Sequence, residues 1–155
     1  DELWKYDVVN GPIMVADINP SGNSDPTHLT VFNNELYFSA DDGTNGDELW
    51  KYDVVNGPIM VADIHPGLGS SMLYDLTVLN NELYFSAYSP NHGFELWRSD
   101  GTNAPSMVAD IYPGITGGNP MDLTVFNNEL YFNAYGQNTG YELWKYSQQT
   151  TITYA

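Results

Sequence analysis

The 155-residue chain contains no cysteine, and it has only four basic residues against twenty acidic ones. Without cysteine, the protein can form neither disulfide bonds nor thiolate metal sites. The formal net charge of −16 repels nucleic-acid phosphates and anionic lipid head groups, so we expect neither as a partner. The chain also lacks an apolar run of the roughly 20 residues that a membrane helix needs, so we expect no membrane insertion.

Aromatic residues are plentiful, with twelve Tyr, six Phe and four Trp, and hydrophobic residues make up 42% of the chain. This composition favours a packed core over disorder. Strong acidity promotes solubility and can attract cations or basic proteins. Because the sequence starts with Asp1 rather than Met, we expect a processed product or a piece of something longer.

An internal repeat organises the whole chain. Glu-Leu-Trp recurs with spacings of 46, 47 and 47 residues, at Trp4, Trp50, Trp97 and Trp144. Met-Val-Ala-Asp recurs at 14–17, 60–63 and 107–110, and Leu-Thr-Val-(Phe/Leu)-Asn-Asn-Glu-Leu-Tyr-Phe recurs from Leu29, Leu76 and Leu123. The basic residues also occupy equivalent positions, at Lys5, Lys51, Arg98 and Lys145. We therefore expect a single repeat domain, 1–155, made of a half repeat (1–27), two repeats (28–74 and 75–121) and a repeat with a divergent last strand (122–155).

Each repeat is predicted to form four short antiparallel strands. Asn33-Asn34 is typical of a two-residue type I′ hairpin turn, because Asn tolerates positive φ. A second turn is expected at Asn56-Gly57 and Pro58. Aromatic and β-branched residues fill the intervening segments, and no helical period appears. In the repeat 28–74 the predicted strands are Leu29–Phe32, Glu35–Ser39, Glu48–Asp53 and Ile59–Ile64.

A four-stranded meander of this length is typical of one β-propeller blade. We therefore predict an all-β, propeller-like fold of about three and a half blades, with Thr150–Ala155 replacing the usual last strand. Propellers need about four blades to close, so this chain should not close a ring by itself. Its end strands would leave edges that can pair with other chains, in a closed ring or an open filament. The alternative fold is an open stack of β-sheets in a filament.

Two motifs give the chain a resemblance to a known family. The segments 41–50 and 95–102, with Asp-Gly-Thr and Glu-Leu-Trp, resemble the ELWxxDGT repeat of large secreted bacterial proteins. The Asp-Ile-x-Pro-Gly segments within 62–67 and 109–114 resemble the same family. The resemblance covers essentially the whole chain and implies a propeller-like repeat and an extracellular or cell-surface location. It implies no catalytic residues.

One loop has the oxygen density that Ca²⁺ prefers, and we regard it as a possible calcium site formed by Asp41, Asp42, Asn45 and Asp47. Its spacing does not match an EF-hand, and a turn satisfying its own backbone is the alternative. No other metal or cofactor is expected.

The acidic residue of each Glu-Leu-Trp motif lies near a recurrent basic residue, so we expect local ion pairs at Glu2, Glu48, Glu95 and Glu142. Every prominent carboxylate is repeated, which indicates a scaffold role rather than a unique active site. No Ser/His/Asp order, phosphate-binding loop or zinc-protease motif occurs. We therefore expect a non-enzymatic protein.

Two functions remain open. The first is an extracellular structural or adhesive scaffold that self-associates, joins neighbouring repeats of a longer chain, or displays a binding surface. The second is a lectin-like module that binds glycans in repeated aromatic pockets. The second requires exposed rings at Trp4, Trp50, Trp97 and Trp144.

Overall fold

The structure, a computed structural model, describes residues 1–148 and 150–154. Its ordered elements are all strands, as expected, and the described residues include no helix that could cross a membrane. The chain forms two compact units, Asp1–Met72 and Leu73–Ala155. The proposed division into a half repeat and three repeats stays a prediction.

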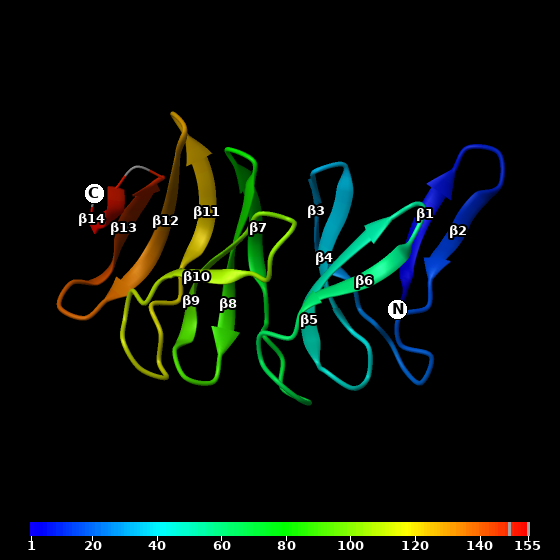
Figure 1. Cartoon of the computed structure of the whole chain (residues 1–155), viewed down its shortest axis with the longest axis horizontal. Helices are drawn as coiled ribbons and strands as arrows, with labels where there is room; N and C mark the ends of the chain where they lie inside the picture. The colour runs from blue at the N-terminus through cyan, green and yellow to red at the C-terminus, as the bar shows by residue number, and fades with distance from the viewer. Residues whose placement is uncertain (149, 155) are drawn as a thin grey trace. The chain divides into compact units, whose positions relative to one another are not determined.

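The first unit contains a two-stranded and a four-stranded antiparallel sheet (Figure 1). Its strands are β1 (Leu3–Asp7), β2 (Gly11–Ala16), β3 (Thr27–Phe32), β4 (Glu35–Asp41), β5 (Asp47–Asp53) and β6 (Gly57–Ala62). β1 pairs only with β2, whereas β3, β4, β5 and β6 follow one another across the larger sheet.

The second unit contains two four-stranded antiparallel sheets, with the strands of each in chain order. The first consists of β7 (Tyr74–Leu79), β8 (Glu82–Ser89), β9 (Gly93–Ser99) and β10 (Ser106–Ala109). The second consists of β11 (Met121–Phe126), β12 (Glu129–Gly136), β13 (Gly140–Ser147) and β14 (Thr150–Tyr154). β14 lies within the segment expected to replace the usual last strand; Ala155 lies outside the described residues.

Equivalent residues pair in the same register in the three larger sheets. Phe38 lies opposite Trp50, Phe85 opposite Trp97, and Phe132 opposite Trp144. The hairpin turns of the three sheets also have the same backbone conformation. Asn33 and Asn34 have φ angles of 50° and 64°, and both later Asn-Asn pairs have nearly the same values. Positive φ at both positions is the type I′ geometry expected from the sequence.

The last hairpin of the repeat differs from the prediction. β6 begins at Gly57 rather than Ile59, and it ends at Ala62 rather than Ile64. Gly57 pairs with Asp53, and its φ of 78° closes a turn whose backbone N–H groups are held by the Asp53 carboxylate. Pro58 is tolerated because β6 is an edge strand and needs no donor at that position.

Each unit has its own apolar core between its two sheets. In the first, Leu3 and Ile18 pack with Phe38 and Ala40, and Trp50 lies against this cluster. In the second, the core joins both sheets through buried side chains, at Leu79, Tyr84, Leu96, Leu123, Leu130, Phe132 and Ala134. These cores fix the sheet edges and loops that carry the polar sites described next.

Candidate functional site

A carboxylate, a phenol and a basic group meet on each four-stranded sheet. The carboxylate belongs to the first residue of the second strand, the phenol lies two residues later, and the basic group comes from the third strand. The ion pairs are Lys51–Glu35 at 3.0 Å, Arg98–Glu82 at 3.2 Å and Lys145–Glu129 at 3.0 Å. The hydroxyl groups of Tyr37, Tyr84 and Tyr131 donate to the same carboxylates.

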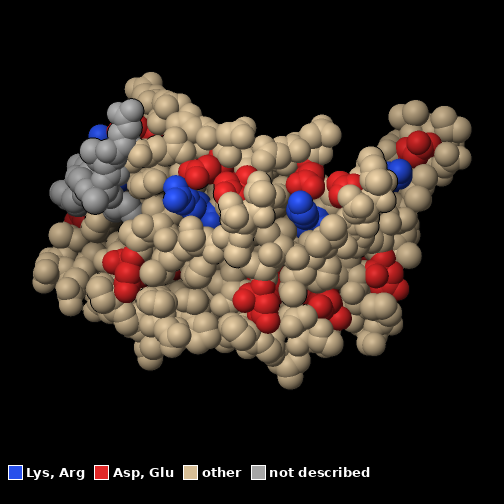
Figure 2. All heavy atoms as spheres, viewed as in Figure 1, with Lys and Arg blue, Asp and Glu red and all other residues tan. Residues whose placement is uncertain are grey.

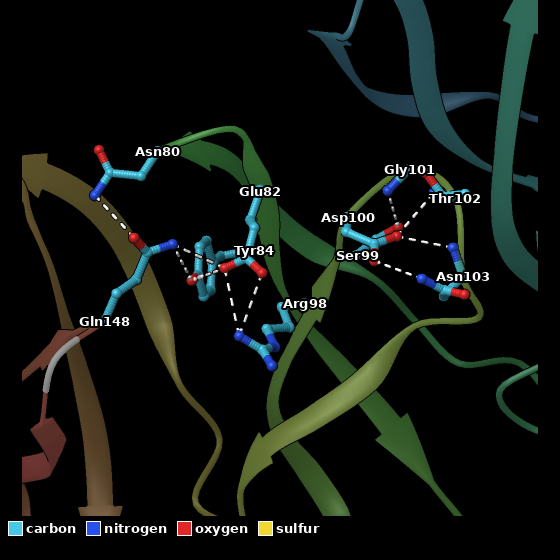
Figure 3. Close-up of polar contacts among 10 residues, drawn as sticks. All are labelled: Asn80, Glu82, Tyr84, Arg98, Ser99, Asp100, Gly101, Thr102, Asn103 and Gln148. Carbon is cyan, nitrogen blue, oxygen red and sulfur yellow. Dashed lines mark hydrogen bonds and ion pairs between the residues drawn. The ribbon is translucent and has the colours of Figure 1, made fainter.

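Figure 3 shows the middle triad, which is extended by Gln148 from the turn between β13 and β14. The Gln148 amide donates to Glu82 at 2.9 Å and accepts a hydrogen bond from Asn80 at 3.1 Å. Burial and the Glu82 carboxylate together raise the pKa of Tyr84. The triad therefore connects the two sheets of the second unit through hydrogen bonds, and its phenol is protonated.

The carboxylates of the Glu-Leu-Trp motif behave differently from the prediction. Glu48 and Glu95 are fully buried, and neither forms an ion pair in the described part of the chain. Glu48 accepts the backbone N–H groups of Ile64 and His65 at 2.8 and 3.1 Å. The expectation of local ion pairs was wrong at these positions because strand alternation places these side chains inward, away from the basic residues.

Glu95 holds the long loop that follows β10. Its oxygens accept backbone N–H groups from Ile111, Tyr112 and Gly118, at 2.8, 3.2 and 2.8 Å. Burial raises the pKa of Glu95 to about 7, against the lowering effect of these donors. Burial also raises the pKa of Glu48. In the half repeat, Glu2 instead accepts the Ser24 hydroxyl at 2.6 Å.

The suggested calcium loop is a network of short-range hydrogen bonds. The Asp42 carboxylate accepts from the backbone N–H groups of Thr44 and Asn45, both at 2.8 Å, and from their side chains. The Asp41 carboxylate accepts the backbone N–H of Gly43, and the backbone N–H of Asp47 donates to the Ser70 hydroxyl. Partial burial tends to raise the pKa of Asp42, but the hydrogen bonds from Thr44 and Asn45 lower it to about 2.

Asp-Gly-Thr-Asn recurs at 100–103 with the same geometry, and Figure 3 shows the second copy. Among residues 1–148 and 150–154, no three His, Cys, Asp or Glu side chains are arranged to hold a metal ion. Calcium binding at Asp41, Asp42, Asn45 and Asp47 stays a prediction.

The four tryptophans differ in exposure. Trp4 is 55% exposed, whereas Trp50, Trp97 and Trp144 are half-buried. The Trp144 indole N–H donates to the Ala134 carbonyl at 2.9 Å, and those of Trp50 and Trp97 are buried with no hydrogen-bond partner among the described residues. Glycan binding by these tryptophans stays a prediction.

A pocket of about 410 Å³ lies in the second unit, where sequence reasoning placed no site. Its lining combines three aromatic rings with hydroxyl, amide and backbone groups, from Phe94, Thr116, Gly117, Asn119, Tyr135 and Tyr141. The Asn119 amide donates to the Tyr141 hydroxyl at 3.0 Å. The available signal was a pair of aromatic positions shared by two repeats: Tyr135 and Tyr141 correspond to Tyr88 and Phe94, whereas the repeat 28–74 has Asp41 and Asp47 there.

The two-stranded sheet matches the last two strands of the sheet β3–β6. β1 and β2 pair in the register of β5 and β6, including the same bulge, but no described strand pairs with the other edge of β1. On β5 that edge is covered by β4. Consequently Trp4 and Tyr6 are 55% and 77% exposed, and Lys5 is in none of the ion pairs of the described chain.

Comparisons of the chain with family models, curated proteins and solved structures found no match.

Proposed function

We propose that this chain is a non-enzymatic scaffold of propeller-like β-repeats. Its function is to assemble with repeats of its own kind and to display a binding surface. The observation that carries the proposal is the same strand order and register in successive sheets, each of which leaves edge strands such as β6 and β10. An unpaired edge is a template for another strand. Association through such edges produces a ring or a filament, depending on whether the rotation closes.

The propeller-like description rests on the equal registers of the three four-stranded sheets and on the repeat length. An open stack of the same sheets is the alternative architecture. The ELWxxDGT resemblance supports this proposal and an extracellular or cell-surface location. Acidic side chains spread over the face drawn in Figure 2 would keep such a scaffold soluble.

The test of this proposal is association in solution. Sedimentation velocity over a concentration series should reveal species larger than the 17.3 kDa monomer, increasing with concentration. Adding calcium and then a chelator shows whether the association depends on calcium. A monomer at every concentration, with and without calcium, would contradict self-assembly.

Glycan binding is a second candidate, and the pocket at Phe94, Tyr135 and Tyr141 favours it. Exposed aromatic rings offer flat apolar surfaces, and the nearby hydroxyl and amide groups can bond to sugar hydroxyls. The pocket also lies on a strongly acidic chain, which favours a neutral saccharide over an anionic one.

The glycan candidate is tested with cellotetraose and chitotetraose as probes, followed by NMR chemical shifts. Binding should be weakened by about tenfold or more in Tyr141→Ala, because a stacking surface is removed. Tyr6→Ala, an exposed tyrosine outside the pocket, is the control and should bind normally. If neither saccharide binds, or both variants bind alike, the pocket is not a site for them.

A further inference from the structure

We propose that residues 110–120, the loop between β10 and β11, form a pH-sensitive flap that Glu95 keeps closed while its carboxyl group is protonated and that opens as this group ionises. The flap covers the Glu95 carboxyl group and supplies one wall of the pocket in the second unit. The inference concerns the state of that pocket and does not depend on which ligand the pocket takes.

The flap is fastened near both of its ends to one side chain. Ile111 and Tyr112 at its start, and Gly118 near its end, donate their backbone N–H groups to the Glu95 carboxyl oxygens. Residues 113–116 between these points are exposed. Gly118 permits the close approach, because a Cβ atom there would lie 2.7 Å from the Ile111 Cβ and 3.3 Å from a Glu95 oxygen. Both ends of the flap therefore depend on the same buried carboxyl group.

The closed flap also joins the two sheets of the second unit. The Asn119 N–H donates to the Phe94 carbonyl on β9 at 2.9 Å, and the Tyr135 N–H on β12 donates to the Gly118 carbonyl at 2.7 Å. Phe94 and Tyr135 line the pocket together with Gly117 and Asn119 of the flap. Opening the flap would therefore remove one wall of the pocket and the backbone bonds that cross it.

The surroundings of Glu95 disfavour its ionised form. Glu95 is fully buried, Ala87 lies opposite it on β8, and it is in none of the ion pairs of the described residues. Of the flap's own side chains only Asp110 and Tyr112 can titrate, and the Tyr112 ring packs on Tyr135. Burial, together with the like charge of Asp110, outweighs the three amide donors and raises the pKa of Glu95 to about 7.

The sign of the effect follows from linkage. An open flap exposes the Glu95 carboxyl group to water, where its pKa returns towards 4.5, so the closed flap binds the proton more tightly than the open one. Opening then releases a proton, and the opening equilibrium constant rises by about tenfold per pH unit between about 4.5 and 7. Above pH 7 both forms are ionised and the constant levels off.

The experiment follows backbone amide exchange in the full chain by NMR from pH 5 to pH 8, with each rate divided by the intrinsic rate of that amide at the same pH. The protection of Ile111, Tyr112 and Gly118 should fall by roughly 70-fold, most of it below pH 7. The amides of Phe85 and Leu96, on buried strands, should stay better protected at every pH, because the flap opens without unfolding of the sheet.

Three variants separate the flap from general effects of pH. Glu95→Gln cannot ionise, so the protection of its flap should not change with pH. Asp110→Asn removes an exposed like charge, which should move the change in protection to lower pH in a chain that stays folded. Glu129→Gln alters a carboxylate paired with Lys145 and should leave the exchange of the flap as in the original chain.

Two results would overturn the inference. The first is protection of the flap amides that does not change with pH in the original chain, since the carboxyl group would then be a permanent fastening. The second is equal protection of the flap and of the buried strands, since the loop would then open only when the unit unfolds.

Discussion

At the scale of single residues, glutamate has two opposite roles on the same sheet. Glu82, at the start of β8, forms an ion pair with Arg98 and accepts the Tyr84 hydroxyl. Glu95, on the neighbouring strand, is fully buried and accepts three backbone N–H groups of the loop after β10. Residue type therefore says less about the role of a carboxylate here than its position in the strand alternation.

The raised pKa of Glu95 predicts how stability depends on pH. Because burial raises it from 4.5 to about 7, the folded chain binds this proton more tightly than the unfolded chain in that window. This contribution to stability is complete below pH 4.5 and is lost as pH rises through about 7, a change on the order of 3 kcal/mol. Urea unfolding from pH 5 to pH 8 measures it.

Glu95→Gln should be less stable than the original chain at pH 5, because its amide nitrogen faces backbone donors. Its stability should change less between pH 5 and pH 8, since it cannot ionise. Glu129→Gln is the matched control: the Lys145 hydrogen bond lowers the pKa of Glu129, so that carboxylate stabilises the fold above its ordinary pKa. Identical pH slopes in the original chain and Glu95→Gln would contradict this assignment.

At the scale of elements, the hairpin turns were predictable and the long loops were not. Asn33-Asn34 identifies a type I′ turn because few residues tolerate positive φ at two successive positions. The loop after β10 gives no such local signal, because it is held from a distance by Glu95. The boundaries of β6 were missed for a related reason, since the Asp53 carboxylate closes a turn that lets Gly57 and Pro58 join the strand.

The turn between β7 and β8 provides a stability prediction. Asn81 has a φ of 64°, and Ala in this conformation is strained, so Asn81→Ala should destabilise the fold by about 1–2 kcal/mol. Asn81→Gly keeps the conformation without strain, so its unfolding temperature should be close to that of the original chain or slightly higher. Thermal unfolding of both variants measures this. Equal losses in the two variants would mean that the Asn81 side chain, rather than its backbone conformation, matters.

At the scale of the whole molecule, the repeat period predicted an all-β chain with strands in meander order, and the structure agrees. The pocket beside Tyr135 and Tyr141 was not predicted from the period, because these aromatic positions are shared with the repeat 75–121 but not with the repeat 28–74. The match between the pair β1–β2 and the pair β5–β6 follows from the repeated segments of the sequence, but the ion pairs of Glu35, Glu82 and Glu129 became visible only in the structure.

The most direct test of the assembly account is the mass of the chain in solution by light scattering, measured with calcium and then with chelator. The account predicts a mass well above 17.3 kDa that rises with the concentration of the chain. Loss of the larger species on chelation would show that a metal ion takes part in the association. A mass of 17.3 kDa in both conditions would contradict self-assembly and direct attention to the pocket of the second unit.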